Sequence, residues 1–177
     1  MKSEQLLRHY AIGDRDFIGV DLSQINLSQQ DLRRTDFWQA NLAQVNFSQA
    51  DLREASLRGA SLVAANLENT DLRRVDLRGA DLRQARLTNA KLEEVIYDET
   101  TQFPANVNLI KSKAYAITPR AALQQAVLSH LDLSGSDLSE ADLREAMLQS
   151  TNLVGSYLVG ADLTGQPSPM PTCPTPI

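Results

Sequence analysis

The sequence contains few of the residues from which active sites and metal sites are usually built. Its single cysteine, Cys173, cannot form an internal disulfide or a thiolate metal site, and two histidines, His9 and His130, are too few for a histidine cluster. Glycine-rich phosphate loops, Gly-x-Ser-x-Gly, His-Glu-x-x-His and Cys-x-x-Cys are all missing. We therefore expect a protein that is not an enzyme, with no catalytic residues, no cofactor and no bound metal.

Long apolar runs and an excess of basic residues are missing as well. Because there is neither a run of about 18 apolar residues nor a basic start followed by an apolar stretch, we expect no transmembrane helix, no secretory signal and a cytoplasmic location. The formal net charge is −5 and the isoelectric point is about 5.0. A chain of this charge lacks the basic footprint of a protein that binds nucleic acid directly.

What the sequence does contain is a strict five-residue period. A leucine or phenylalanine returns at every fifth position from Phe17 to Leu92, and the period closes on Tyr97. An α-helix repeats its apolar face every ~3.6 residues and a strand every 2, so the backbone must turn a corner once per unit. Two positions before the central residue stands a small one, most often alanine, as at Ala40, Ala50, Ala55, Ala60, Ala65, Ala80, Ala85 and Ala90. One large and one small inward residue per unit suit a narrow closed tube.

The units read Ala-Asn-Leu-Ala-Gln at 40–44, Ala-Asp-Leu-Arg-Glu at 50–54 and Ala-Asp-Leu-Arg-Gln at 80–84. They resemble the consensus Ala-(Asp/Asn)-Leu-X-X of the pentapeptide-repeat family, and the resemblance covers about 15–97 and 126–165. It implies an all-β solenoid, a right-handed quadrilateral β-helix in which four pentapeptides make a coil of about 20 residues.

Coils of this length would stack equivalent residues of successive coils in columns. Outside, Asn26, Asn46 and Asn66 fall in register, where their amides can pass hydrogen bonds from coil to coil. Inside, we expect two core columns: Phe17, Phe37, Leu57, Leu77 and Tyr97, and Leu27, Phe47, Leu67 and Leu87.

One side of the expected coils combines acids with arginines. Asp-Leu-Arg-Arg at 31–34, Asp-Leu-Arg-Glu at 51–54 and Asp-Leu-Arg-Arg at 71–74 place a carboxylate beside one or two guanidinium groups in each coil. Exposed pairs of this kind contribute about 0–1 kcal/mol each. Two interpretations remain open, a solvated mixed-charge face and an arginine-lined docking surface.

Five segments are expected along the chain. Residues 1–13 form an N-terminal cap, since Ser3 can be the N-cap of a short helix within 3–11 that has Leu6, Leu7 and Tyr10 on one side. A first repeat block covers 14–103, and its phase predicts one extra residue between Tyr97 and Phe103. The other segments are an interruption at 104–127, a second block at 128–165 and a proline-rich tail at 166–177.

The interruption should contain a helix over about 119–128. Thr118 followed by Pro119 is a good helix start, and Ala122, Leu123, Ala126 and Val127 supply an apolar stripe.

The second block is acidic and carries apolar residues at outward positions. Between Leu128 and Leu163, Arg144 is the one basic residue, against Asp132, Asp137, Glu140, Asp142, Glu145 and Asp162. Apolar side chains stand at Met147, Val154, Tyr157 and Val159, where the consensus is polar, and such a cluster indicates a contact surface.

These features favour a non-enzymatic interaction scaffold that binds a protein partner. Because some pentapeptide-repeat proteins act as DNA mimics toward type II topoisomerases such as DNA gyrase, the resemblance leaves an alternative in which the six acids imitate phosphates. Two states of association are also open: a monomer if the tail covers the last coil, and an end-to-end homodimer if it does not.

Overall fold

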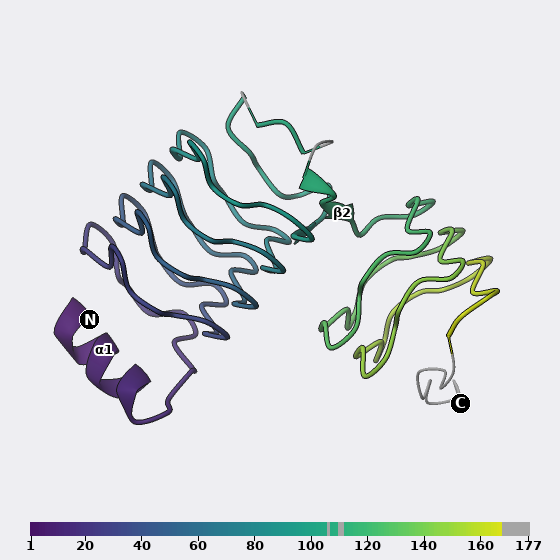
Figure 1. The fold of residues 1–177 in the computed structure, drawn as a ribbon, viewed down its shortest axis with the longest axis horizontal. Coiled ribbons are helices and arrows are strands. Elements are labelled where there is room, and N and C mark those ends of the chain that lie inside the picture. Colours follow the sequence, from purple (N-terminus) through teal and green to yellow (C-terminus); the bar gives the residue numbers. More distant parts are fainter. Residues whose placement is uncertain (106, 110–111, 168–177) are drawn as a thin grey trace. The chain divides into compact units, whose positions relative to one another are not determined.

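The computed structural model describes residues 1–105, 107–109 and 112–167, so Cys173 and most of the proline-rich tail lie outside the described residues. The chain divides into two compact units, Met1–Ala114 and Tyr115–Ile177. Three regular elements are present in this part of the chain: helix α1 (Ser3–Ala11), strand β1 (Ile96–Tyr97) and strand β2 (Tyr115–Ala116). Everything else that repeats is built from single parallel bridges between stacked coils (Figure 1).

Each coil is made of four sides, and each side is one pentapeptide. In the first unit parallel bridges join Asp16 to Asp36, Asp36 to Ser56 and Ser56 to Asp76, and the other three sides repeat the same spacing. The second unit does so by itself, with bridges such as the one from Ala122 to Asp142. The bridged residue is the one before the central residue, which is leucine or phenylalanine except at Tyr97.

The side around Leu57 shows how each backbone N–H is satisfied. The N–H of Ala55 bonds back along its own coil to the carbonyl of Leu52 (3.0 Å), and the N–H groups of Ser56, Leu57 and Gly59 donate to neighbouring coils (2.9, 2.8 and 2.8 Å). The fifth N–H, two positions after the bridged residue, has no backbone acceptor in this ladder. Where the bridged residue is Asp or Asn, its side-chain oxygen accepts that bond, as Asn26 does from Ser28 (3.0 Å). The consensus Asp or Asn is therefore a backbone partner as well as a solubilising residue.

The last residue of each side turns the corner with a positive φ. Gln24 (63°), Arg34 (59°) and Glu54 (61°) adopt this left-handed backbone without being glycine. Long polar side chains tolerate it because they point to solvent, and the inter-coil bond of the corner N–H holds the conformation in place.

The inward residues form one continuous core in the first unit. Phe17, Phe37, Leu57 and Leu77 in one expected column, and Leu27, Phe47 and Leu67 in the other, are buried. Tyr97 and Leu87, in the last coil of this unit, are half-buried. Phe17 contacts Phe37 with ring centroids 5.9 Å apart, and Phe37 contacts Phe47 at 6.2 Å.

Leu6 of α1 is also fully buried in this core, so the helix covers the first coil as the sequence predicts. The expected N-cap, Ser3, is wrong: Ser3 is already the first residue of α1, and Lys2 is the N-cap, with its backbone N–H bonded to the Gln5 side chain.

The extra residue predicted between Tyr97 and Phe103 is present. Asp76 bridges Ile96 at the regular spacing of one coil, whereas Asp81 bridges Gln102, one position farther along the chain than that spacing requires. Asp98 organises the wider turn, because one of its carboxylate oxygens accepts bonds from the N–H groups of Gly79 and Thr100 (3.1 and 3.0 Å). Tyr97 and Phe103, which flank this turn, pack edge to face with ring centroids 5.6 Å apart.

The helix expected over 119–128 is wrong, and the second repeat block begins earlier than residue 128. Thr118 and Ala121 close a tight turn (3.2 Å), and Arg120 has a positive φ of 61°, which a right-handed helix excludes. Ala121 and Leu123 are buried as the small and the central residue of a pentapeptide, whereas Ala122 is exposed. The apolar stripe was the five-residue repeat itself, which over a short stretch imitates a helical face.

Candidate functional site: an arginine-lined hollow

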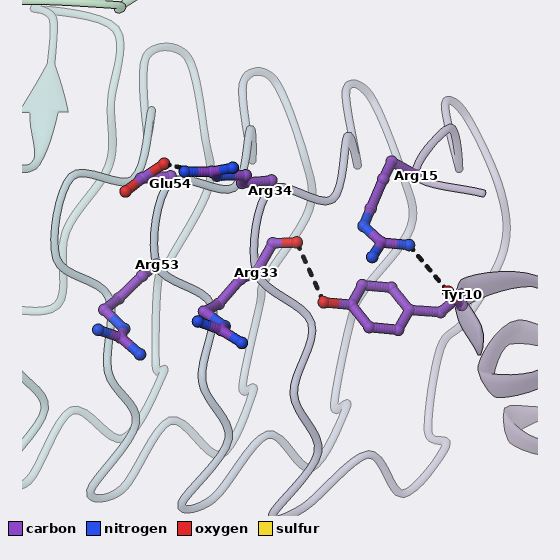
Figure 2. A pocket seen from close by; sticks show the side chains of 6 residues that line it. All are labelled: Tyr10, Arg15, Arg33, Arg34, Arg53 and Glu54. Carbon is purple, nitrogen blue, oxygen red and sulfur yellow. Dashed lines mark hydrogen bonds and ion pairs between the residues drawn. The ribbon is translucent and has the colours of Figure 1, made fainter. Parts of the chain in front are cut away.

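A hollow of about 280 Å³ lies on the charged side of the first unit, next to α1. It is lined by the six side chains drawn in Figure 2, four of them arginines: Tyr10, Arg15, Arg33, Arg34, Arg53 and Glu54. Arg33 and Arg53 occupy the same position in successive coils, and Tyr10 comes from α1. The sequence flagged the arginines of 31–34 and 51–54, but it gave no sign that Tyr10 and Arg15 would close one end.

Each arginine of the central row is held by the aspartate two residues before it. Arg33 donates to both carboxylate oxygens of Asp31, from Nε (2.9 Å) and from Nη2 (2.7 Å). Arg53 clamps Asp51 and Arg73 clamps Asp71 in the same way. Arg33 and Arg53 also approach the aspartate of the next coil, at 3.7 Å from Asp51 and 3.9 Å from Asp71. The clamp fixes a side chain that would otherwise sample many rotamers.

The remaining lining residues are tied down differently. Arg34 Nε donates to Glu54 Oε2 across one coil step (2.8 Å), as Figure 2 shows. Arg15 lies over the Tyr10 ring, with its guanidinium carbon 3.7 Å from the ring centroid, and its Nη1 donates to two backbone carbonyls. The Tyr10 hydroxyl donates to Asp31 Oδ1 and to the Arg33 carbonyl, both at 3.2 Å, which anchors the helix to the last side of the first coil.

The pKa shifts follow from these contacts. Hydrogen bonds from Arg33 hold the pKa of Asp31 far below its usual range, and those from Arg53 lower the pKa of Asp51. Burial, followed by the charge of Asp31, raises the pKa of Tyr10. Asp31 and Asp51 are therefore ionised, and the Tyr10 hydroxyl is protonated, at neutral pH.

The acids of the second unit have more partners than the sequence suggested. Arg120, which the expected boundary at 128 excluded, donates to Glu140 (2.8 Å), and Arg144 clamps Asp142 (2.6 Å). Asparagine, glutamine or backbone donors contact the rest: Asp132 from Asn152, Asp137 from Ser139, Glu145 from Gln125 and Asp162 from Thr164. Of these contacts, the ion pairs with Arg120 and Arg144 neutralise part of the negative charge, whereas the bonds from neutral donors leave it in place.

The apolar residues singled out in the second block are exposed. Met147, Val154, Tyr157 and Val159 all lie at the surface, with Val159 77 % exposed. Within the described ranges, no three acidic, histidine or cysteine side chains lie where they could hold a metal, and no helix is both long and apolar enough to cross a membrane.

The backbone turns a corner in every pentapeptide, and every fourth pentapeptide closes a coil. This arrangement is a repeat solenoid that displays side chains on flat sides. The chain belongs to the pentapeptide-repeat family: it matches pentapeptide repeats, in eight copies, at residues 16–49, 31–69, 60–96 and 126–165.

Solved structures of this family resemble the chain. The pentapeptide repeat protein alr5209 from Nostoc PCC 7120 is 37 % identical over 65 % of this chain and 95 % of its own, with a TM-score of 0.64. HetL of the same cyanobacterium, involved in heterocyst differentiation regulation, is 28 % identical over 94 % of both chains, with a TM-score of 0.31. QnrB1, a plasmid-mediated fluoroquinolone resistance protein, is 16 % identical over 85 % of this chain and 71 % of its own, with a TM-score of 0.45. A search of curated proteins gave no match.

Proposed function

We propose that this protein is a non-enzymatic interaction scaffold, a right-handed quadrilateral β-helix whose arginine-lined face (31–34, 51–54 and 71–74) docks a protein partner. The observation that carries the proposal is the clamp repeated at Asp31–Arg33, Asp51–Arg53 and Asp71–Arg73, which presents three guanidinium groups at coil spacing on one side.

Preorganised guanidinium groups suit a partner with acidic side chains. A clamped arginine loses little further freedom on binding, and its planar fork can take a second carboxylate. The partner's charge would also steer its approach, although the chain as a whole is acidic.

The test is capture of partners from the native organism by the immobilised protein and by a triple variant, Arg33→Gln, Arg53→Gln and Arg73→Gln. A partner of this face should bind the wild type and be lost from the variant. Arg83→Gln is the matched control, because Arg83 clamps Asp81 in the same geometry on another side of the coil. Equal capture by all three proteins would reject the docking face.

A second candidate is mimicry of DNA by the second unit. It is supported by the excess of acids between residues 115 and 167, where six acids stand against two arginines, Arg120 and Arg144. The ion pairs of Glu140 and Asp142 weaken it, because they neutralise part of the negative surface.

Mimicry predicts that about 10–50 µM protein slows supercoiling by DNA gyrase and that added salt relieves the inhibition, since the contact would be electrostatic. A double variant, Asp132→Asn and Asp137→Asn, should inhibit less, whereas Asp16→Asn in the first unit should inhibit like the wild type. No inhibition at low salt would discard this candidate.

A further inference from the structure

We propose that the arginine-lined hollow is a binding site for a small phosphate-type oxyanion, either inorganic phosphate or a phosphate monoester. The site goes beyond the docking role, because it needs no protein partner and uses the end of the arginine row that α1 and Arg15 close.

The first argument is the supply of uncommitted donors. In Arg33 and Arg53 the aspartate clamp occupies Nε and Nη2, and no described residue accepts a hydrogen bond from either Nη1. Both side chains remain accessible, at 50 % and 39 % exposure. Arg15 donates to carbonyl oxygens and forms no ion pair with a described carboxylate, so its charge is not neutralised by direct contact.

The second argument is the local charge. Four guanidinium groups and one carboxylate, Glu54, line the hollow, and Asp31 and Asp51 lie behind the arginines. These seven groups carry one positive charge, and Asp71, 3.9 Å from Arg53, is itself clamped by Arg73, in a chain whose net charge is −5. Glu54 would repel an anion, but Arg34 pairs with it at 2.8 Å.

The third argument is shape and order. Arg33 and Arg53 lie side by side in Figure 2 and both contact Asp51, so their guanidinium groups are one coil step apart. A tetrahedral oxyanion has enough oxygens to accept from two neighbouring guanidinium groups at once. A volume of about 280 Å³ admits a phosphate group and a small attached moiety. The arginines are already positioned, which reduces the entropy lost on binding.

The experiment titrates the purified full chain with inorganic phosphate, and separately with phosphoserine, at low ionic strength, following backbone amide shifts by NMR. We expect saturable shifts centred on residues 10–15, 31–34 and 51–54. Arg53→Gln should weaken binding about tenfold or more, because it removes one of two paired donors. Circular dichroism should show that the exposed substitution leaves the fold intact.

Arg73→Gln is the matched control. Arg73 is clamped by Asp71 as Arg53 is by Asp51, but it lies outside the hollow, so its loss should change the affinity less than twofold. Phosphate binding without phosphoserine binding would assign the site to the free ion, and tighter phosphoserine binding would assign it to esters. Absence of saturation at about 10 mM of either ligand, or equal weakening by the two variants, would overturn the proposal, since non-specific attraction would then explain the data.

The outcome of the partner-capture experiment is independent of the outcome of the phosphate titration. A protein can lose its partner in the triple variant and still bind no phosphate, or bind phosphate and capture no partner.

Discussion

Where an aspartate or asparagine precedes the central residue, its side-chain oxygen accepts the one backbone N–H that has no backbone acceptor in the coil-to-coil ladder. Asp51 shows the second use of the same side chain, because one oxygen accepts the N–H of Arg53 (3.2 Å) while both carboxylate oxygens bind its guanidinium. A single residue type therefore accepts the remaining backbone N–H and also holds the arginine of the charged surface in position.

The central position should not tolerate a charge. Leu57 is fully buried in a column of apolar side chains, so Leu57→Asp should destabilise the protein by more than about 4 kcal/mol and prevent folding. Arg58→Ala, at the next, outward and only half-buried position, should change the free energy of unfolding by less than about 0.5 kcal/mol. Circular dichroism and urea denaturation measure both, and a folded, soluble Leu57→Asp protein would show that the inward and outward faces are misassigned.

The clamps predict a definite pH dependence. Hydrogen bonds from Arg53 and Arg83 lower the pKa values of Asp51 and Asp81 in the folded protein, below about 3.9 in the unfolded chain. Their contribution is therefore complete above the unfolded pKa and is lost as the pH falls through the lower, folded pKa.

Urea denaturation should accordingly show little change in the free energy of unfolding from pH 7 to pH 5 and a decline below about pH 4. Asp51→Asn should be less stable than the wild type at pH 7, and the difference should shrink at pH 3. A difference that grows on acidification would contradict the sign of the shift.

Among the elements, the five-residue turn replaces the conventional strand. Within the described ranges only Ile96–Tyr97 and Tyr115–Ala116 are strands, and each is very short, because the backbone reaches a corner before a longer ladder can form. The turn at Thr118–Ala121 shows why the expected helix fails. Pro119 suits the second position of a tight turn as well as the first turn of a helix. The positive φ of Arg120 is compatible with the turn and not with the helix.

Helix α1 acts as the cover of the first coil, and Leu6 is its anchor. Leu6→Ala should cost about 2–4 kcal/mol, because it leaves a cavity between the helix and the core. Ile12→Ala removes a comparable apolar side chain just after the helix, but Ile12 is 82 % exposed, so it should cost less than about 0.5 kcal/mol. Urea denaturation compares the pair, and equal losses would show that α1 does not seal the coil.

In the molecule as a whole, the charge is distributed unevenly between the units. The first unit holds 15 basic and 16 acidic residues, whereas the second holds two arginines and six acids. The local excess of arginine around the hollow is therefore a property of one side of the first unit, which the net charge conceals.

We propose that the last coil mediates a two-fold dimer, because its central residues Leu153, Leu158 and Leu163 are only half-buried and Tyr157 and Val159 are exposed beside them. Light scattering should give a dimer for the wild type and a monomer for the double variant Tyr157→Arg, Val159→Asp. Ile18→Asp, at an exposed apolar position of the first unit, should leave the dimer intact. A monomeric wild type would make these residues ordinary surface.

The sequence alone determined the repeat, its inward positions and the one-residue shift after Tyr97, because a narrow tube requires the same side-chain sizes in every unit. A short period is written into neighbouring residues, so it can be read without knowing where distant residues lie. The tertiary structure decided what depends on distant or out-of-phase residues. It turned 118–121 into a corner, set Arg120 against Glu140, and brought Tyr10 of α1 to Asp31 and Arg33. The hollow exists because a helix that does not obey the period packs against coils that do, and no pattern within either segment records that contact.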